Sequence, residues 1–226
     1  MAFGTDTDYF GLGDTHWKIQ GSGITPSASN DPTPDENGDN ICEVTYDEFN
    51  TYQASYRLIG VAADTQTIDT KVKVGQIFPL DTTARAVVNS IEIATSNTEN
   101  PLITVQAEQY FGDTGGQLGF ANALTVLPIK RAQGLGVTAD TVSRIISSSA
   151  TITGQTYRVL DSDGDPAQSD LSGGRAEASA ELISCTANPG VAAASGWTLV
   201  QAVARSSENT RQETASINVY KNLTRA

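Results

Sequence analysis

The sequence predicts an all-β protein, a sandwich or barrel of about nine or ten antiparallel strands. Three observations lead to this prediction. Apolar and polar residues alternate with a period of two along several short segments. Turn-forming Gly, Pro, Asn and Asp separate these segments at spacings of roughly 10–15 residues. The composition is rich in Ser, Thr, Asn and Gln with only 18% charged residues, unlike a helical or a wholly disordered protein.

The segment 87–109 shows the alternation most clearly, because it reads as two strands joined by a turn. Ile91 and Ile93 alternate with other residues in the first strand, and Ile103 and Val105 do so in the second. The joining sequence SNTENP is typical of a turn, since Asn and Ser bond to the nearby backbone and proline is excluded from a central strand. We expect this pair to have one buried face.

By the same criterion, further strands are expected over residues 52–58, 68–74, 121–129, 141–152, 156–160, 176–185, 197–205 and 214–221. Residues 81–91 are ambiguous. Asp81 is a candidate helix cap, and apolar residues follow it at helical spacing. We favour a loop leading into the strand at residue 87, because that strand is rich in β-branched residues. The chain is therefore expected to have at most one short helix.

Residues 1–40 differ from the remainder, so we expect an extended N-terminal arm over 1–40 and a β-sandwich or barrel domain over 41–226. The arm is rich in Gly and Pro, has seven acidic residues against one lysine, and shows no periodicity. A purely solvated tail would not usually carry four aromatic residues. We predict that these insert into pockets on a neighbouring subunit: Phe3, Tyr9, Phe10 and Trp17. Disorder, or packing on the arm's own domain, is the alternative.

Weak internal similarity raises a possible duplication, with sub-units at 41–128 and 129–226. GVAADT at 60–65 resembles GVTADT at 136–141, SIEI at 90–93 resembles SAEL at 179–182, and ITVQA at 103–107 resembles TLVQA at 198–202. The order is kept while the offsets lengthen from 76 to 89 to 95 residues. If the repeat is real, two similar β-units pack into one sandwich or lie side by side.

The charge balance argues against nucleic-acid binding. The net charge is −12 and the isoelectric point is 4.4, whereas a duplex-binding protein neutralises phosphates with Lys and Arg. No stretch approaches a membrane span, and the first residues lack the features of a signal peptide. Cys42 and Cys185 fit no metal-site spacing and are expected to be small half-buried thiols, although a disulfide between them stays open.

Three motifs invite a functional interpretation, and a simpler one is favoured for each. GLGVTA at 134–139 has the glycine spacing of a dinucleotide loop, but a β-like segment follows it, so we expect a turn. A weak candidate Ca²⁺ site is formed by Asp161, Asp163 and Asp165 in DSDGD. A tight Asp-Gly hairpin turn fits better, because the EF-hand glycine and glutamate positions do not match. His16, the one histidine, is expected at the surface of the arm. We predict no enzyme activity and no cofactor.

The arm at 1–40, the strand pair at 87–109 with its SNTENP turn, and the loop DSDGDPAQSDLSGG before AEASAELI resemble parts of a virion structural protein. The profile is similar to that of the tail tube, or major tail, proteins of long-tailed bacteriophages. The resemblance implies a β-sandwich or barrel that forms rings, commonly hexameric, stacked into a hollow tube by arms and long loops. A negative lumen would not trap passing DNA. A typical tube fold also carries one packed helix, and only residues 81–91 offer one.

The resemblance implies that the partners are copies of the same chain and other virion proteins, with no membrane and no specific nucleic-acid binding. The protein would be made in the bacterial host cytoplasm and end in the virion. Two other classes stay open. A capsid decoration, head-fibre or tail-adaptor protein predicts small oligomers that bind a larger shell. A β-sandwich enzyme or carbohydrate-binding module predicts a monomer whose melting transition is raised by ligand.

Overall fold

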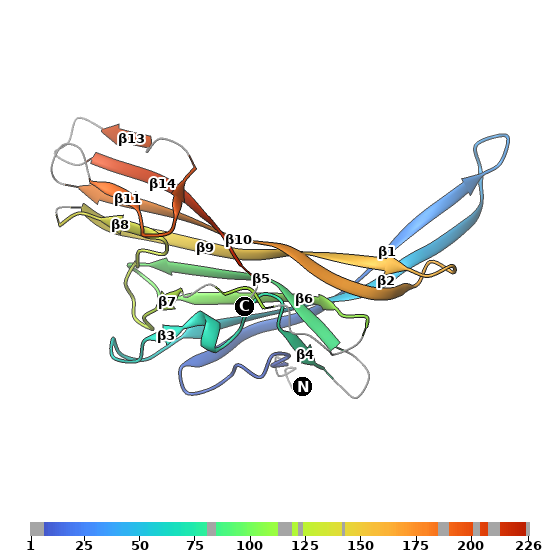
Figure 1. Cartoon of the computed structure of the whole chain (residues 1–226), viewed down its shortest axis with the longest axis horizontal. Coiled ribbons are helices and arrows are strands. Elements are labelled where there is room, and N and C mark those ends of the chain that lie inside the picture. The colour runs from blue at the N-terminus through green and yellow to red at the C-terminus, as the bar shows by residue number, and fades with distance from the viewer. Residues whose placement is uncertain are drawn as a thin grey trace, which may run out of the picture.

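The computed structural model describes residues 7–80, 85–112, 119–121, 124–141, 143–184, 190–200, 204–207 and 213–224. Within them the protein is an antiparallel all-β fold, as the sequence predicts, built on one ten-stranded sheet (Figure 1). The strands follow one another in the order β1-β2-β6-β5-β9-β10-β14, and β12 and β13 both pair with β14. Their bounds are β1 Trp17–Pro34, β2 Asn40–Leu58, β5 Arg85–Ser96, β6 Leu102–Gln109, β9 Ser143–Leu160, β10 Pro166–Ser184, β12 Thr198–Leu199, β13 Ala204–Ser207 and β14 Glu213–Asn222.

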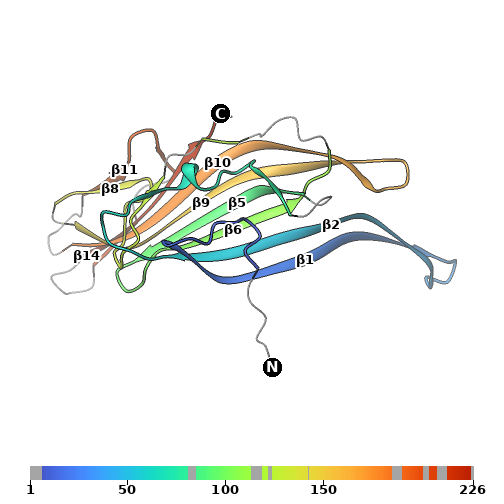
Figure 2. The same ribbon diagram turned by 90° about the horizontal axis from the view of Figure 1, so that it is seen from below.

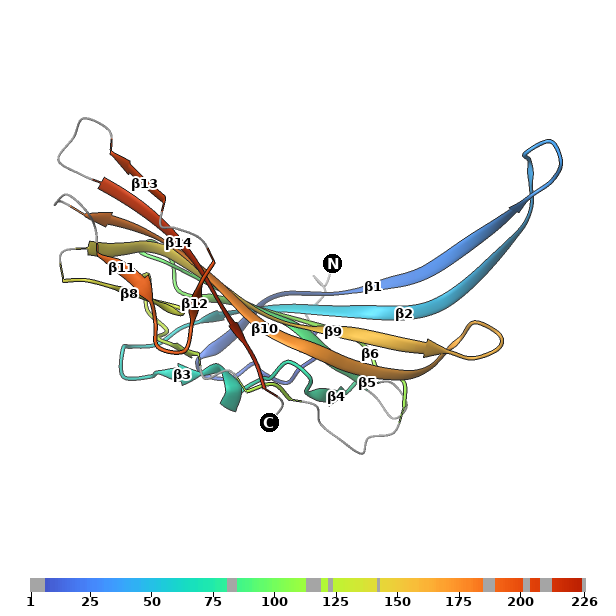
Figure 3. The same cartoon turned by 45° about the horizontal axis from the view of Figure 1, so that its top comes forward.

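A second, thinner layer covers one face of the large sheet (Figures 1 and 3). It contains two small ladders, β3 with β7 and β8 with β11. β4, which pairs with the first residues of β5, is the tenth strand of the large sheet. The bounds are β3 Gln66–Thr67, β4 Ile77–Pro79, β7 Thr125–Val126, β8 Val137–Ala139 and β11 Val191–Ala193, and a 3-10 turn, η1, covers Ile68–Thr70. The core lies between the layers, where the inner face of the sheet meets fully buried side chains such as Trp17, Ile68 and Leu135.

The predicted strand pair at 87–109 is confirmed. β5 and β6 pair antiparallel on either side of the SNTENP turn, with Ile91 opposite Val105 and Ile93 opposite Ile103. These four side chains are at most 1% exposed, whereas the intervening Glu92 is exposed. Full burial of each such side chain contributes about 1.5–3 kcal/mol. The pair lies at the centre of the large sheet, between β2 and β9.

Two predicted strands in the middle of the chain are wrong in kind or extent. Residues 68–74 bury Ile68, Val72 and Val74 as predicted, but from the 3-10 turn and a loop. Within the described part of 121–129 only β7 is strand. In both places the apolar residues are buried in the thin layer, as their spacing indicates. Turns and loops bury them as well as strands do, so the spacing does not identify a strand.

Most predicted elements after residue 140 are longer than expected. The exception is the strand expected at 197–205, where only β12 and the start of β13 are strand and residues 201–203 lie outside the described residues. Residues 143–152 and 156–160 belong to one strand, β9, and the loop expected at 166–174 is the first half of β10. Backbone pairing forms these mostly polar segments, although Leu171 in β10 is buried in the core. Of the ambiguous segment 81–91, residues 85–91 are strand, as favoured, and 81–84 lie outside the described residues.

A separate N-terminal arm over 1–40 is wrong for residues 17–34. They form β1, which pairs with β2 along its whole length. The domain boundary expected at residue 40 therefore lies within a single β-hairpin, at the start of β2. The outer half of β1 is exposed on both faces. A strand without a buried face has no reason to alternate apolar and polar residues, so periodicity missed it.

The large sheet is a tandem repeat of two halves with the same order of pairing. The first half runs β1-β2-β6-β5, and the second runs β9-β10-β14 and then β12 with β13 (Figure 2). The hairpin β9–β10 begins and ends 126 residues after the hairpin β1–β2. All three register shifts recur at this offset: Ile19/Gly21 as Ile145/Ser147, Ser27/Ser29 as Thr153/Gln155, and Thr33/Pro34 as Val159/Leu160. Three coincident irregularities in hairpins of equal length show a structural duplication.

The residue equivalences expected from the internal similarity are wrong, although two similar units do lie side by side. The similarity matched residues 90–93 of β5 with 179–182 of β10, but β10 is the counterpart of β2. Across the first half, Tyr56 pairs with Ile103, which pairs with Ile93. Across the second half the aligned residues are Leu182, Ala215 and Arg205. The β5–β6 pair therefore recurs at an offset of 112 residues.

Candidate assembly surface

Both long hairpins extend past the ends of β5 and β6 in the same direction, and β1–β2 extends further (Figures 1 and 3). Their strands carry exposed apolar side chains, with exposed fractions from 37% to 69%: Ile24, Ile41, Val44, Tyr157, Val159 and Leu160. Apolar side chains gathered on a projecting element are typical of an interaction surface. Cys42 also lies here as a free, exposed thiol, so it is not the half-buried thiol expected; Cys185 lies outside the described residues.

The two hairpins end in the same turn. PDENGD at 34–39 and LDSDGD at 160–165 share the pattern Asp-x-Asn/Asp-Gly-Asp. Oδ1 of Asp35 accepts the backbone N–H groups two and four residues later at 2.8 and 2.9 Å, and Oδ1 of Asp161 does so at 2.9 and 3.0 Å. These bonds lower the pKa of Asp35. Gly38 and Gly164 both have a φ of +87°, which favours glycine.

This turn takes the place of the weak candidate Ca²⁺ site at Asp161, Asp163 and Asp165. One oxygen of Asp161 is already held by two N–H groups. Across the described ranges, no group of three or more His, Cys, Asp or Glu side chains is placed to hold a metal ion. GLGVTA at 134–139 leads into strand β8 and not into a helix, so it also lacks the helix N-terminus that a dinucleotide loop requires.

A charged clamp joins the second hairpin to the first. Arg158 on β9 donates from Nε and Nη2 to both carboxylate oxygens of Asp47 on β2, at 2.7 and 3.0 Å. Its Nη1 donates to Glu108 on β6 at 2.8 Å, and its guanidinium lies 3.6 Å from the centre of the Phe49 ring. The Arg158 side chain is only 16% exposed. The hydrogen bonds to Asp47 are the largest cause of a pKa of Arg158 above its usual range.

A β-bulge presents Asp47 to this arginine. Ser27 pairs with Phe49 and Ser29 with Tyr46, so residues 47–48 oppose a single residue of β1. Asp47 has a φ of +51°, unusual for a residue other than glycine. Its N–H donates to the carbonyl of Gly164 at 3.0 Å. The tip of the second hairpin is thus docked on the bulge of the first.

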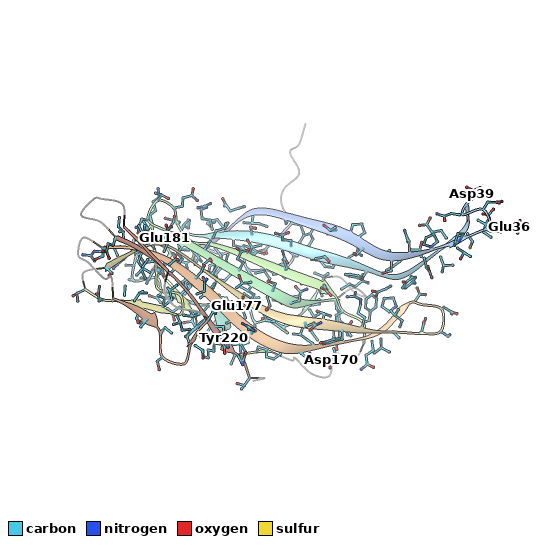
Figure 4. All side chains as sticks on the ribbon, turned by 90° about the horizontal axis from the view of Figure 1, so that it is seen from above. Glu36, Asp39, Asp170, Glu177, Glu181 and Tyr220 are labelled. Carbon is cyan, nitrogen blue, oxygen red and sulfur yellow. The ribbon has the colours of Figure 1, made fainter. Side chains whose placement is uncertain are left out.

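The projecting ends concentrate negative charge. Residues 31–48 hold seven acidic residues, residues 159–174 hold four, and neither range contains Lys or Arg. In Figure 4, Glu36 and Asp39 mark the outermost turn, and Asp170 lies on the second hairpin. At the opposite end of the sheet Lys130, Arg131 and Arg144 are exposed. The projecting end therefore carries acids without bases, whereas the opposite end carries bases together with acids such as Glu99 and Glu181.

The sheet has two open edges in the described part of the chain. One is the outer side of β1, and the other is the outer side of β12 and β13. Each edge exposes apolar side chains: Ile24 is 50% exposed on the first, and Leu199 and Val200 are 43% and 52% exposed at the second. Unpaired edges of this kind are templates for pairing with another chain.

The uncovered face of the sheet is polar. A shallow groove of about 550 Å³ crosses it, lined largely by small hydroxyl side chains and Glu181. In Figure 4 Glu177, Glu181 and Tyr220 lie along this part of the sheet. Small-molecule sites are usually enclosed, and this groove is open to solvent.

His16 makes surface contacts, as the sequence predicts. Its Nδ1 lies 3.2 Å from Oγ1 of Thr15, and its Nε2 lies 3.5 Å from Oδ2 of Asp64. The His16 and Asp64 side chains are 31% and 32% exposed. The His16 carbonyl accepts the N–H of Ile59 at 2.8 Å. The pair joins the start of β1 to the loop after β2.

The aromatic residues predicted to contact a neighbouring subunit pack on their own domain instead, which was the stated alternative. Phe10 is 4% exposed and Trp17 is fully buried, so the prediction is wrong for both. Large aromatic rings that lie beside the apolar inner face of the sheet are stabilised by packing on that face. Phe3 lies outside the described residues. The ring pairs are Tyr9–Tyr52, Phe10–Phe78 and Trp17–Tyr56, with centroids 5.7, 5.3 and 6.0 Å apart.

Two aspartates fix this N-terminal segment. Asp8 accepts the hydroxyl of Tyr56 at 2.5 Å, and burial followed by this hydrogen bond raises the pKa of Tyr56 above its usual range. Asp14 accepts the N–H groups of the residues two and three positions later and the ammonium of Lys71 at 3.0 Å. Burial alone would raise the pKa of Asp14, but the hydrogen bonds outweigh it and lower that pKa to about 2.

No protein-family model and no curated protein matches this sequence.

The chain itself contains two signals of the repeat that sequence reasoning missed, both at an offset of 126 residues. DTHWKI at 14–19 recurs as DTVSRI at 140–145, and the Asp-x-Asn/Asp-Gly-Asp turn recurs at the hairpin tips. The first signal has the same structure twice, because the N–H of Trp17 donates to Asp14 and that of Ser143 donates to Asp140. Among the described residues no helix is long and apolar enough to span a membrane.

Proposed function

We propose that this protein is a structural subunit that assembles with copies of itself into stacked rings around a channel, like the tail tube proteins of long-tailed bacteriophages. The observation that carries the proposal is the open, repeated sheet. Two equivalent halves are joined strand to strand, and among the described residues the outer strand of each half has no further neighbour. A contact that joins equivalent units within a chain is suited to join further copies, and a head-to-tail contact of this kind generates a ring when its rotation closes.

The two faces of the sheet support a channel. The covered face is closed by the thin second layer, whereas the polar face presents Ser, Thr, Gln and carboxylate side chains without a covering element (Figures 1 and 4). In the proposed ring this polar face lines the lumen. It has few free cations, so passing DNA would find little to bind, which agrees with the net charge of −12.

The projecting hairpins are the elements that reach beyond one ring. Their acidic tips lie at one end of the sheet, and the bases of residues 130–144 lie at the other, so copies stacked in the same direction bring opposite charges together. The partners are then copies of this chain and other virion proteins, and the protein is made in the bacterial cytoplasm and incorporated in the virion.

Negative-stain electron microscopy of the purified chain between low and high salt tests the proposal. We expect rings or tubes with a central channel, and growth promoted by salt, because the Debye length falls from about 30 Å at 0.01 M to about 3 Å at 1 M and subunit repulsion falls with it. Sedimentation across the same series gives the size distribution. Single compact particles at every salt concentration would overturn the proposal. Small closed oligomers without tubes would favour a decoration or adaptor protein instead.

A further inference from the structure

We propose that neighbouring copies join by repeating the junction that links the two halves of one chain. The β12–β13 edge of one copy pairs antiparallel with β1 of the next copy, and the β1–β2 tip of that next copy docks on the β10 bulge. This inference rests on the proposed self-assembly and specifies its contact, residue by residue.

The internal junction supplies the template. β5, the last strand of the first half, pairs antiparallel with β9, the first strand of the second half, from Ser90 opposite Thr153 to Ser96 opposite Ser147. In the middle of this run Ile93 lies opposite Ala150. β12–β13 is the counterpart of β5 and β1 is the counterpart of β9. The two open edges are therefore the two members of this pairing, and in the described residues each lacks the other.

The repeat offsets fix the register between copies. Arg205 corresponds to Ile93 at 112 residues, and Ile24 corresponds to Ala150 at 126 residues. The junction therefore places Arg205 of one copy opposite Ile24 of the next. It places residues 204–207 opposite residues 25–22 in antiparallel order.

The burial of the two first strands agrees with a missing neighbour. Ala150 on β9 is 1% exposed, and its counterpart Ile24 on β1 is 50% exposed. Among the described residues, β9 has β5 beside it, whereas β1 has no strand beside it and is contacted here by Thr7, whose N–H donates to Ser22 at 2.8 Å. The next residues, Thr25 and Thr151, are more exposed than Ala150 and lie on the opposite face. Pairing with a second copy would bury Ile24 and leave Thr25 on the polar face.

The hairpin tips give a second, independent correspondence. Within the chain, the carbonyl of Gly164 at the second tip accepts the N–H of Asp47 in the bulge of the first half. The counterparts are Gly38 at the first tip and Gly173 in the bulge of the second half, and Gly173 repeats the positive φ of Asp47 with a value of +65°. A Cβ added to Gly38 or to Gly173 would meet nothing within 4 Å. Both positions are open in the single copy.

The charges around this second contact are complementary, with the signs reversed. Inside the chain a base on the tip strand, Arg158, meets acids on the body. Between copies the counterpart of Arg158 is Pro32, next to Asp31 on the acidic tip. The counterpart of Phe49 on the body is Arg175, which is 45% exposed, lies 4.6 Å from the Tyr220 ring centre and pairs with the exposed Glu177 at 2.8 Å. An acidic tip thus meets a base on the body of the previous copy, where it competes with Glu177.

Cysteine cross-linking tests the register in the full-length chain with both native cysteines replaced, Cys42→Ser and Cys185→Ser. The test variant carries Arg205→Cys with Ile24→Cys, since directly opposed Cβ atoms lie about 5 Å apart in an antiparallel pair. The matched control carries Arg205→Cys with Thr25→Cys, which points to the other face. After mild oxidation of assembled protein, we expect a ladder of covalent multimers from the test variant and little above background from the control.

A second pair of variants removes the dependence on disulfide geometry. Ile24→Asp places a charge in the proposed junction and is expected to raise the protein concentration needed for assembly by roughly tenfold or more. Thr25→Asp, on the polar face, is expected to change it far less. Both positions are exposed in the single copy, so circular dichroism should show an unchanged fold.

The outcomes separate the inference from the function it rests on. If the cysteine-free parent assembles but the test variant gives no ladder and Ile24→Asp assembles as well as Thr25→Asp, the edge pairing is wrong and self-assembly stands. If the parent stays a single particle at all salt concentrations, the proposed function is wrong and the inference falls with it. A ladder from the control alone would show pairing in another register and would also overturn the inference.

Discussion

Replacing Arg158 tests whether the clamp between the two hairpins stabilises the fold. Arg158→Met keeps much of the apolar stem while removing the guanidinium. The change breaks two hydrogen bonds to Asp47 at 2.7 and 3.0 Å and one to Glu108 at 2.8 Å. It also leaves two carboxylates, each about 20% exposed, close together without a cation.

The expected cost follows from burial. Exposed ion pairs contribute about 0–1 kcal/mol, and breaking a buried pair costs about 3–5 kcal/mol. The Arg158 side chain is 16% exposed, and its contact with Phe49 adds about 0.5–1 kcal/mol. We expect Arg158→Met to lower the free energy of unfolding by about 3 kcal/mol, measured by urea denaturation at low salt, where assembly is weakest.

Arg57→Met is the matched control, because Arg57 pairs with Glu99, a side chain that is 66% exposed. It should cost below about 1 kcal/mol. Hydrogen exchange supplies a local measurement, since the N–H of Asp47 donates to Gly164 across the clamp and should lose protection in Arg158→Met alone. Equal losses in the two variants, or unchanged exchange at Asp47, would refute the reasoning.

Three further predictions concern other parts of the fold. The pKa of Asp14 is lowered to about 2, so the ionised Asp14 carboxylate stabilises the folded state fully above about pH 4, and this contribution is lost as the pH falls through 2. Because the Asp14 side chain is 37% exposed, we expect the contribution to the free energy of unfolding to be about 1 kcal/mol. Asp14→Asn should flatten the unfolding free energy between pH 4 and 2, and an unchanged slope would contradict this. Gly136→Ala should destabilise by about 2–3 kcal/mol in thermal or urea unfolding, because φ is +70° and the new Cβ would lie 2.7 Å from the Trp197 ring; Gly21→Ala, with nothing within 4 Å, is the control. Replacing residues 30–45 by Asn-Gly joins Ser29 to its cross-strand partner Tyr46 through a two-residue turn and removes the hairpin tip. We expect the thermal unfolding temperature to be nearly unchanged and the tubes in electron micrographs to be shorter. Tubes of unchanged length would exclude the tip from ring stacking.

Strands were predicted most accurately from the sequence where one face of the strand is buried and the other is exposed to solvent. β5, β6 and β14 alternate apolar and polar residues, and their bounds came close to those observed. The tight turn at 161–165 was also predictable, because Asp and Gly favour it for local reasons. The candidate metal set there was set aside on the same local chemistry.

The candidate assembly surface was largely missed from the sequence, because strands without a buried face show no alternation of apolar and polar residues. The outer part of β1 is exposed on both faces, so its sequence is free of periodicity and reads as an arm. Phe10 and Trp17 were correctly singled out as residues that need a pocket, but sequence does not say which molecule provides it. The pocket is their own core.

By itself the sequence determined the fold class, the central strand pair, the turns and the acidic ends, because these depend on side-chain chemistry within a few residues. Only the tertiary structure decided that two hairpins 126 residues apart are equivalent and that Arg158 reaches Asp47 over 111 residues of chain. Within the described part of the chain, it also decided that Ile24 and the β12–β13 edge have no strand beside them. Backbone pairing and bulge positions use groups common to nearly every residue, so they leave little trace in the sequence until the strands are placed side by side.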